Sequence, residues 1–223
     1  YNTEMEDCAA GYAAYVVELL ENAKQTCTDP VVLIEQRVDF SRWVKDGFGT
    51  ADCILIADGV LNIVDYKHGK GVRVSAEKNP QMMLYALGSL QIFDGIYDIE
   101  SVRMTIFQPR LSNVSVSEMA KDELLEWADT ELTQKAQLAY EGKGDFHSGE
   151  WCRFCKAKAE CRERAKANLE LAKYEFAEPP LLGDAEIADI LGKLDGLTSW
   201  AADVKEYALQ QAVGGKKWTG WKL

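Results

Sequence analysis

Two apolar segments joined by Asp58-Gly59 are the feature that most constrains the fold of this chain. Residues 51–57 and 60–67 are rich in aliphatic and β-branched side chains, which favour strands. An Asp-Gly pair between two such segments is typical of a two-residue hairpin turn. We therefore predict a buried antiparallel hairpin in which the numbers of two paired residues add up to about 117.

Further helices and strands are expected on both sides of this hairpin, because apolar residues recur there at helical or at alternating spacing. The order of the elements predicts an α/β (α+β) fold with a central mixed sheet flanked by helices. The expected elements are helices over residues 4–25, 80–93 and 117–140, the last capped by Ser117, and strands over residues 31–40 and 101–108.

The chain has 223 residues and 47% apolar composition, which is enough to bury a substantial core. We expect a C-terminal helical extension that packs on the same domain, with helices over 184–194 and 196–213 after a linker at Pro179-Pro180. The expected parts are a core over residues 1–145, a cysteine-rich segment over 146–175 and the extension over 176–223.

A net charge of −11 argues against a general nucleic-acid binder but is compatible with a metal site lined by carboxylates. Six basic residues between Arg153 and Lys166 predict either a solvated helix face or a patch that contacts phosphates. No apolar stretch of about 18 residues and no signal peptide are visible, so we expect a cytoplasmic protein without a membrane partner. We also expect the natural chain to continue beyond both ends; the oligomeric state is left open.

The hairpin carries a group of charged residues with a chemical meaning. Pairing around Asp58-Gly59 places Asp52 opposite Asp65, and Lys67 follows on the same face as Asp65. Two opposed carboxylates destabilise a sheet unless a cation neutralises them. A divalent cation bound by such oxygens can promote phosphodiester hydrolysis, because it activates water and neutralises phosphate charge. The Tyr66 carbonyl is a candidate further ligand, and Glu35 on the preceding strand is either a ligand or an edge charge.

Gln81 and Tyr85 are four residues apart and therefore share one face of the expected helix over 80–93. Taken alone, this pair is more typical of a polar residue beside a core tyrosine. An Asp-x-Lys sequence alone is also common by chance. The combination of these motifs is much more specific for an active site than either motif alone. It consists of Asp52 at a strand start, then Asp65-x-Lys67, then Gln81-x-x-x-Tyr85.

These motifs resemble the PD-(D/E)XK superfamily, and within it the RecB-like nucleases and a phage-associated exonuclease branch. The resemblance implies a restriction-endonuclease-like αβββαβ core and hydrolysis of DNA with Mg²⁺ or Mn²⁺. It implies Asp52 and Asp65 as metal ligands with the Tyr66 carbonyl, and Lys67 as the catalytic lysine. The motifs are Gly49-Thr50-Ala51-Asp52, Val64-Asp65-Tyr66-Lys67 and Gln81-x-x-x-Tyr85, with Glu35–Phe40, Asn79–Met82 and Gln108-Pro109-Arg110 as branch cues.

The resemblance further implies that Gln81 and Tyr85 bind the substrate strand or brace the site. DNA is the implied substrate, and phage or host recombination and repair proteins are implied partners. RecB-like nucleases commonly carry a metal-ligating histidine on a helix before the first strand. The two histidines of this chain, His68 and His147, lie elsewhere.

Three cysteines close together, Cys152, Cys155 and Cys161, predict a soft metal, either zinc or an iron–sulfur cluster. A trio lacks one thiolate of a closed site. The resemblance implies a [4Fe–4S] cluster completed by a distant N-terminal cysteine, for which Cys8 and Cys27 are candidates.

Three functions therefore remain open. The first is a metal-dependent DNA nuclease, and the second is a catalytically impaired module of the same fold that binds DNA ends or a partner protein. The third, a zinc-binding interaction protein, leaves the opposed aspartates unexplained.

Overall fold

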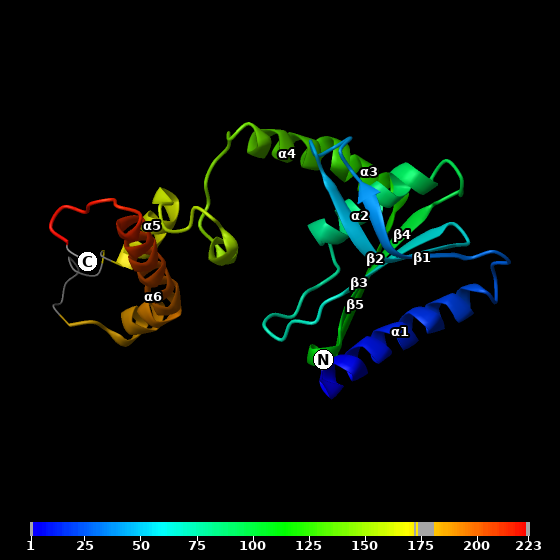
Figure 1. The fold of residues 1–223 in the computed structure, drawn as a ribbon, viewed down its shortest axis with the longest axis horizontal. Helices are drawn as coiled ribbons and strands as arrows, with labels where there is room; N and C mark the ends of the chain where they lie inside the picture. The colour runs from blue at the N-terminus through cyan, green and yellow to red at the C-terminus, as the bar shows by residue number, and fades with distance from the viewer. Residues whose placement is uncertain (1, 172, 174–180, 222–223) are drawn as a thin grey trace. The chain divides into compact units, whose positions relative to one another are not determined.

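The computed structural model describes residues 2–171, 173 and 181–221. The chain divides into two compact units, Tyr1–Lys143 and Gly144–Leu223 (Figure 1). The cysteine segment and the C-terminal helix both belong to the second unit. That the C-terminal extension packs on the core stays a prediction.

The first unit is built on a five-stranded open sheet whose order follows the sequence, β1-β2-β3-β4-β5. All neighbours are antiparallel except β3 and β4, which are parallel and joined through α2. The expected hairpin register is confirmed, since Cys53 pairs with Val64 and Ile54 with Ile63. The strands are β1 (Val31–Asp39), β2 (Phe48–Ala57), β3 (Val60–Tyr66), β4 (Ser101–Gln108) and β5 (Asn113–Ala120).

Helices cover both faces of this sheet, so the expected mixed sheet flanked by helices is confirmed. α1 lies along one face, where Val16 packs with Cys53 and Val64 (Figure 1). The opposite face carries the larger core, in which Leu87 of α2 and Leu124 of α3 pack with the sheet. The helical elements of this unit are α1 (Thr3–Ala23), α2 (Pro80–Phe93), η1 (Pro109–Leu111), α3 (Lys121–Trp127), the π-helical turn η2 (Ala128–Leu132) and α4 (Thr133–Tyr140).

The alternation of side chains slips by one residue in the middle of β1 and β2. Ala51 and Ile54 both belong to the core beneath α2, although strict alternation would place them on opposite faces. Glu35 of β1 lies across from Asp52 of β2, between the pairs Ile34–Cys53 and Gln36–Ala51, and it has a positive φ of 52°. Asp52 is therefore placed at a local irregularity of the sheet, where strands often redirect a side chain.

The expected helix start at Ser117 is wrong, because residues 113–120 form strand β5 and the helix begins at Lys121. Ser112 adopts a left-handed conformation (φ 47°) that closes a tight connection after β4, and the chain returns antiparallel to it. The alternating Val114 and Val116 favour this extended conformation. From Lys121 to Tyr140 the chain is helical, as expected, with the turn η2 in the middle.

The second unit is helical and contains η3 (Glu150–Phe154), α5 (Arg162–Leu169) and α6 (Asp184–Val213). The two helices expected after residue 184 are one helix, because the isolated glycines Gly192 and Gly196 cost too little to interrupt it. Arg164 is buried and pairs with Asp203 at 2.6 Å, so part of the basic run is structural. The expected linker at Pro179-Pro180 lies outside the described residues. No described helix has the length and apolarity needed to cross a bilayer.

Cys53 provides a test of the burial of the hairpin. Burial, together with the nearby Asp52 carboxylate, raises the pKa of the Cys53 thiol to about 11. We expect iodoacetamide at pH 8 to leave Cys53 unmodified in the native, chelator-treated protein while it alkylates the exposed Cys155. Peptide mapping by mass spectrometry measures both sites, and urea-unfolded protein is the control in which both react. Equal labelling of the two thiols in native protein would contradict this burial.

Candidate active site

Asp65 is the charged side chain at the centre of the candidate site, near the end of β3. Only 2% of its surface is exposed. Its Oδ2 lies 2.7 Å from Nζ of Lys67 in an ion pair, yet among the described residues no donor makes a well-directed hydrogen bond to that oxygen. Its Oδ1 accepts a hydrogen bond of 3.4 Å from Nε2 of Gln81. Lys67 already neutralises this oxygen, and a carboxylate oxygen has further acceptor capacity with which it can also bind a cation.

The electrostatics of Asp65 agree with this geometry. Burial raises the pKa of Asp65 above its ordinary value of 3.8, the ion pair with Lys67 opposes that rise, and the Asp52 charge adds to it. A divalent cation beside the two carboxylates would favour their ionised forms and so oppose the rise in the pKa of Asp65.

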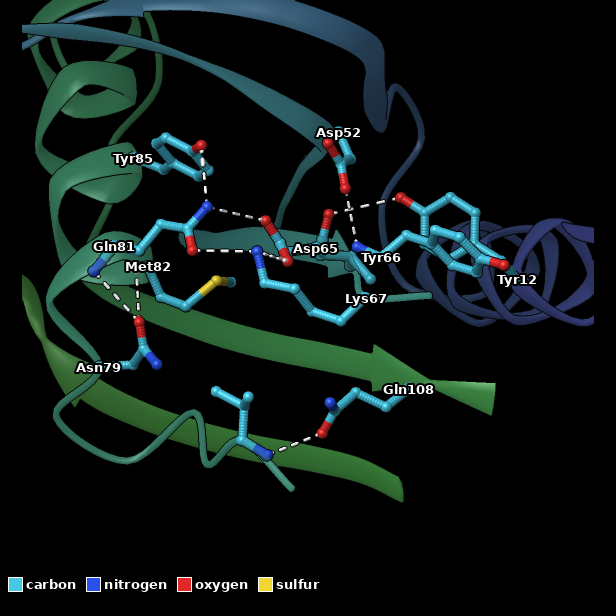
Figure 2. Close-up of polar contacts among 12 residues, drawn as sticks. Tyr12, Asp52, Asp65, Tyr66, Lys67, Asn79, Gln81, Met82, Tyr85 and Gln108 are labelled. Carbon is cyan, nitrogen blue, oxygen red and sulfur yellow. Dashed lines mark hydrogen bonds and ion pairs between the residues drawn. The ribbon is translucent and has the colours of Figure 1, made fainter. Parts of the chain in front are cut away.

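Lys67 connects Asp65 to helix α2 through a chain of hydrogen bonds (Figure 2). Its Nζ donates to Oε1 of Gln81 at 2.9 Å, and Nε2 of Gln81 donates to the Tyr85 hydroxyl at 3.0 Å. The predicted shared face of Gln81 and Tyr85 is thereby confirmed. Asn79 aligns this helix start, since its side chain accepts from the backbone N–H of Gln81 at 3.1 Å.

Asp52 reaches the site from the neighbouring strand. Its Oδ2 accepts a hydrogen bond of 2.7 Å from the backbone N–H of Tyr66, the residue after Asp65 (Figure 2). This contact holds the Asp52 carboxylate against the end of β3. The expected proximity of the two aspartates is thus present, although the irregularity of β2 and a backbone hydrogen bond produce it rather than simple cross-strand pairing.

The Tyr66 side chain lies on the other face of the sheet, as the alternation predicts. Its ring packs against Tyr12 of α1 at 5.3 Å between centroids, and its hydroxyl lies 2.8 Å from Nδ1 of His68. Only the backbone of Tyr66 can therefore serve the site. Glu35 is exposed and lies across from Asp52 in the register of β1 with β2, and its two expected roles, ligand or edge charge, stay predictions.

Tyr12 is a residue of this region that the sequence pattern did not reveal, because at helical spacing it is indistinguishable from an ordinary apolar contact. Its hydroxyl donates to the Val64 carbonyl at 3.4 Å. Burial raises the pKa of Tyr12, and the charges of Cys53, Asp52, Asp65 and Glu35 contribute in that order. The Tyr12 hydroxyl is therefore close enough to Asp52, Asp65 and Glu35 for their charges to affect its pKa.

Gln108 is a second residue that the sequence did not single out for the site. It is 2% exposed and fixes the loop that precedes α2. Its Oε1 accepts from the backbone N–H of Val74 at 2.8 Å and from the Asn113 amide at 2.7 Å, while its Nε2 donates to the Val72 carbonyl at 3.1 Å. The loop between Lys67 and Gln81 is thus tied to the end of β4.

We expect Gln108→Leu to release this loop without unfolding the sheet. Leucine keeps most of the volume but leaves the Val74 N–H without its acceptor, a loss worth about 1–3 kcal/mol. Hydrogen exchange of the Val74 amide should accelerate by about tenfold or more, since about 1.4 kcal/mol corresponds to a factor of ten. The Met82 amide, which Asn79 holds at 3.3 Å, is the internal control. Unchanged exchange at Val74 would show that Gln108 does not anchor the loop.

The residues suited to holding a hard cation are Asp52 and Asp65, with the Tyr66 carbonyl beside them. Mg²⁺ binds through one or two carboxylates and keeps several waters, so this set fits a hydrated Mg²⁺ or Mn²⁺. Within the part of the chain that the structure describes, no group of three or more His, Cys, Asp or Glu side chains is arranged to enclose a metal.

The three clustered cysteines lie in the second unit as free thiols. Cys152 is buried, and its Sγ accepts from the Gly149 N–H at 3.4 Å, whereas Cys155 is exposed and Cys161 immediately precedes α5. The structure does not arrange them as a ready three-ligand site among the described residues. A zinc or iron–sulfur site there stays a prediction.

The fold and site define the first unit as an α+β protein with a mixed open sheet and a buried carboxylate–lysine pair at the end of a central strand. The chain belongs to the family described as "Protein of unknown function (DUF2800)", whose model matches residues 1–223. Among solved structures it is weakly similar to the crystal structure of SSO0001, with 15% identity over 73% of this chain and 78% of that chain and a TM-score of 0.27.

Proposed function

We propose that this chain is a metal-dependent DNA nuclease of the RecB-like type. The observation that carries the proposal is the buried Asp65, whose Oδ2 pairs with Lys67 and otherwise lacks a well-directed hydrogen bond among the described residues, with Asp52 held beside it. Such a pair of carboxylates with a lysine matches the requirements of phosphodiester hydrolysis.

Each residue has a role in this proposal. Asp52 and Asp65 would hold Mg²⁺ or Mn²⁺, which neutralises phosphate charge and lowers the pKa of bound water. Lys67 would stabilise the negative charge that develops on the phosphate, because its Nζ is already directed into the site. Gln81 orients Lys67 through the hydrogen bond of 2.9 Å, and Tyr85 orients Gln81 in turn.

The order of elements supports a restriction-endonuclease-like core as part of this proposal. α1, β1, β2, β3, α2 and β4 follow one another in the order αβββαβ, and the site residues fall on β2, β3 and α2. Function depends on the site rather than on the fold, so the order is supporting and the carboxylate–lysine geometry is primary.

Hydrolysis of end-labelled linear single- and double-stranded DNA tests the proposal. The chain is incubated with Mg²⁺, with Mn²⁺ or with EDTA, and products are separated by denaturing electrophoresis. We expect cleavage with either metal and none with EDTA. No cleavage by folded, metal-supplemented protein would overturn the nuclease proposal.

The alternative of an impaired nuclease-fold module is favoured by one observation. Helix α1, which precedes the first strand, contains no histidine, whereas RecB-like nucleases commonly carry a metal-ligating histidine there. The cleavage assay and a gel-shift experiment together separate the two functions, because such a module would bind DNA ends without shortening them.

A further inference from the structure

Outside the candidate active site, one carboxylate of α1 is held by two cations from different segments. Oε1 of Glu4 lies 3.0 Å from Nζ of Lys70 and 3.0 Å from Nε of Arg110. Oε2 of Glu4 also accepts a hydrogen bond of 3.3 Å from Nη2 of Arg110. Arg110 therefore binds the Glu4 carboxylate through two nitrogens, and Lys70 adds a third contact.

These cations lie at the same edge of the sheet as the candidate site. Strands β3 and β4 are parallel, so their carboxyl ends meet, and the N–H of Lys67 donates to the Phe107 carbonyl at 2.9 Å. Lys70 follows Lys67 by three residues, and Nη1 of Arg110 donates to the His68 carbonyl at 3.4 Å. The start of α1 lies beside η1, which contains Arg110 (Figure 1).

The arrangement of Arg110 and Lys70 around Glu4 can bind anions other than a carboxylate. The guanidinium fork binds carboxylate and phosphate oxygens with the same geometry, and a nearby lysine adds a point charge. Lys70 and then Arg110 lower the pKa of Glu4, so both cations favour an anion at this position. The Glu4 and Lys70 side chains are 46% and 57% exposed, and exposed ion pairs are weak enough to exchange for another anion.

We propose that Arg110 and Lys70 form a subsite for a backbone phosphate of the nucleic-acid strand, which the Glu4 carboxylate occupies as an internal competitor in the free protein. The inference rests on the proposed function and deepens it, because it assigns the nucleic-acid strand a path along the carboxyl ends of β3 and β4, where Lys67 begins the loop after β3. It also explains how a chain with net charge −11 can present local positive charge to a polyanion.

The test measures binding of a fluorescein-labelled oligothymidylate to the full chain by anisotropy in EDTA, where cleavage cannot occur, at several NaCl concentrations. Glu4→Gln should tighten binding about two- to fivefold, since it removes the competitor. Arg110→Ala should weaken binding and reduce the slope of log affinity against log salt by about 0.7. In the double variant the gain from Glu4→Gln should disappear, because the subsite itself is damaged.

Glu21→Gln is the matched control, because Glu21 is an exposed, ion-paired glutamate of the same helix. It changes the net charge equally and should leave affinity nearly unchanged. If Glu4→Gln gives no more gain than Glu21→Gln, or if its gain persists with Arg110→Ala, the subsite is refuted. Lower melting temperatures with unchanged binding would mean that the contact is only a structural clamp.

The outcome is independent of the cleavage assay. An Arg110-dependent gain in a chain that never cleaves DNA would uphold the subsite and reject the nuclease. Metal-dependent cleavage with no effect of Glu4→Gln on binding would uphold the nuclease and reject the subsite.

Discussion

Asp65→Asn and Lys67→Ala are each expected to lower the rate of metal-dependent DNA cleavage by about 100-fold or more. Loss of one group that stabilises developing charge costs about 10²–10³-fold in comparable sites. Asp65→Asn removes the charge of a proposed metal ligand, and Lys67→Ala removes the cation that contacts both Asp65 and Gln81. Initial rates with Mg²⁺ or Mn²⁺ at saturating DNA measure the effect.

Lys121→Ala is the matched control for Lys67→Ala. Lys121 forms a 2.9 Å ion pair with Asp94, and its side chain is 26% exposed, against 2.7 Å and 30% for Lys67. The two lysines are thus matched in exposure and pairing distance within one unit, and they differ in that the Asp65 partner is buried (3% exposed) and the Asp94 partner is not (37% exposed). We expect Lys121→Ala to cleave at nearly the wild-type rate, and an equal loss in both variants would point to a general structural effect.

Asp65→Asn carries a second signature, which is its effect on stability. A carboxyl group whose pKa is raised by folding contributes stability at pH values below its unfolded pKa, and that contribution is lost as the pH rises through the folded pKa. Burial raises the pKa of Asp65 above 3.8, so in EDTA the wild type should lose stability relative to Asp65→Asn as the pH rises from about 4. Melting temperatures from pH 4 to 7 measure the difference, and a constant difference would contradict this account.

Gly88→Ala is expected to destabilise the first unit by about 2 kcal/mol, although alanine is the better helix former by about 1 kcal/mol. A Cβ at Gly88 would lie 2.8 Å from Cβ of Val38 and 3.2 Å from backbone atoms of Asp39. Helix α2 thus approaches β1 so closely that only glycine fits, and the strand backbone cannot yield cheaply. Urea unfolding followed by circular dichroism measures the change.

Gly11→Ala in α1 is the control for this prediction. Gly11 is exposed, and an added Cβ would meet only the Phe107 ring, at 3.9 Å. Here helix propensity should decide, and we expect stabilisation by about 0.5–1 kcal/mol. If both variants were stabilised, the close contact of α2 with β1 would be refuted.

Local signals explain which elements could be predicted. The Asp58-Gly59 turn determines the hairpin register, because a two-residue turn leaves one pairing. Asn79 and Pro80 determine the start of α2, and the helical repeat places Gln81 and Tyr85 on one face. Each of these features depends on interactions within a few residues of the chain.

The missed features depend on contacts between distant segments. Strand β5 forms at Ser117 because β4 offers an unpaired edge, and that pairing outweighs the local cap that the serine would make. Tyr12 meets the site only after α1 packs on the sheet. Gln108 shows its role only when the loop from Val72 to Val74 folds back on β4.

The sequence by itself determined the hairpin, the α+β order and the identity of the charged residues, because turn chemistry and periodicity act locally. Only the tertiary structure decided that Asp65 is buried, that Asp52 reaches it through a slip in β2, and that Glu4 lies between Lys70 and Arg110. The physical reason is that burial and ion pairing depend on which surfaces meet in the folded chain, and a local pattern cannot specify that meeting.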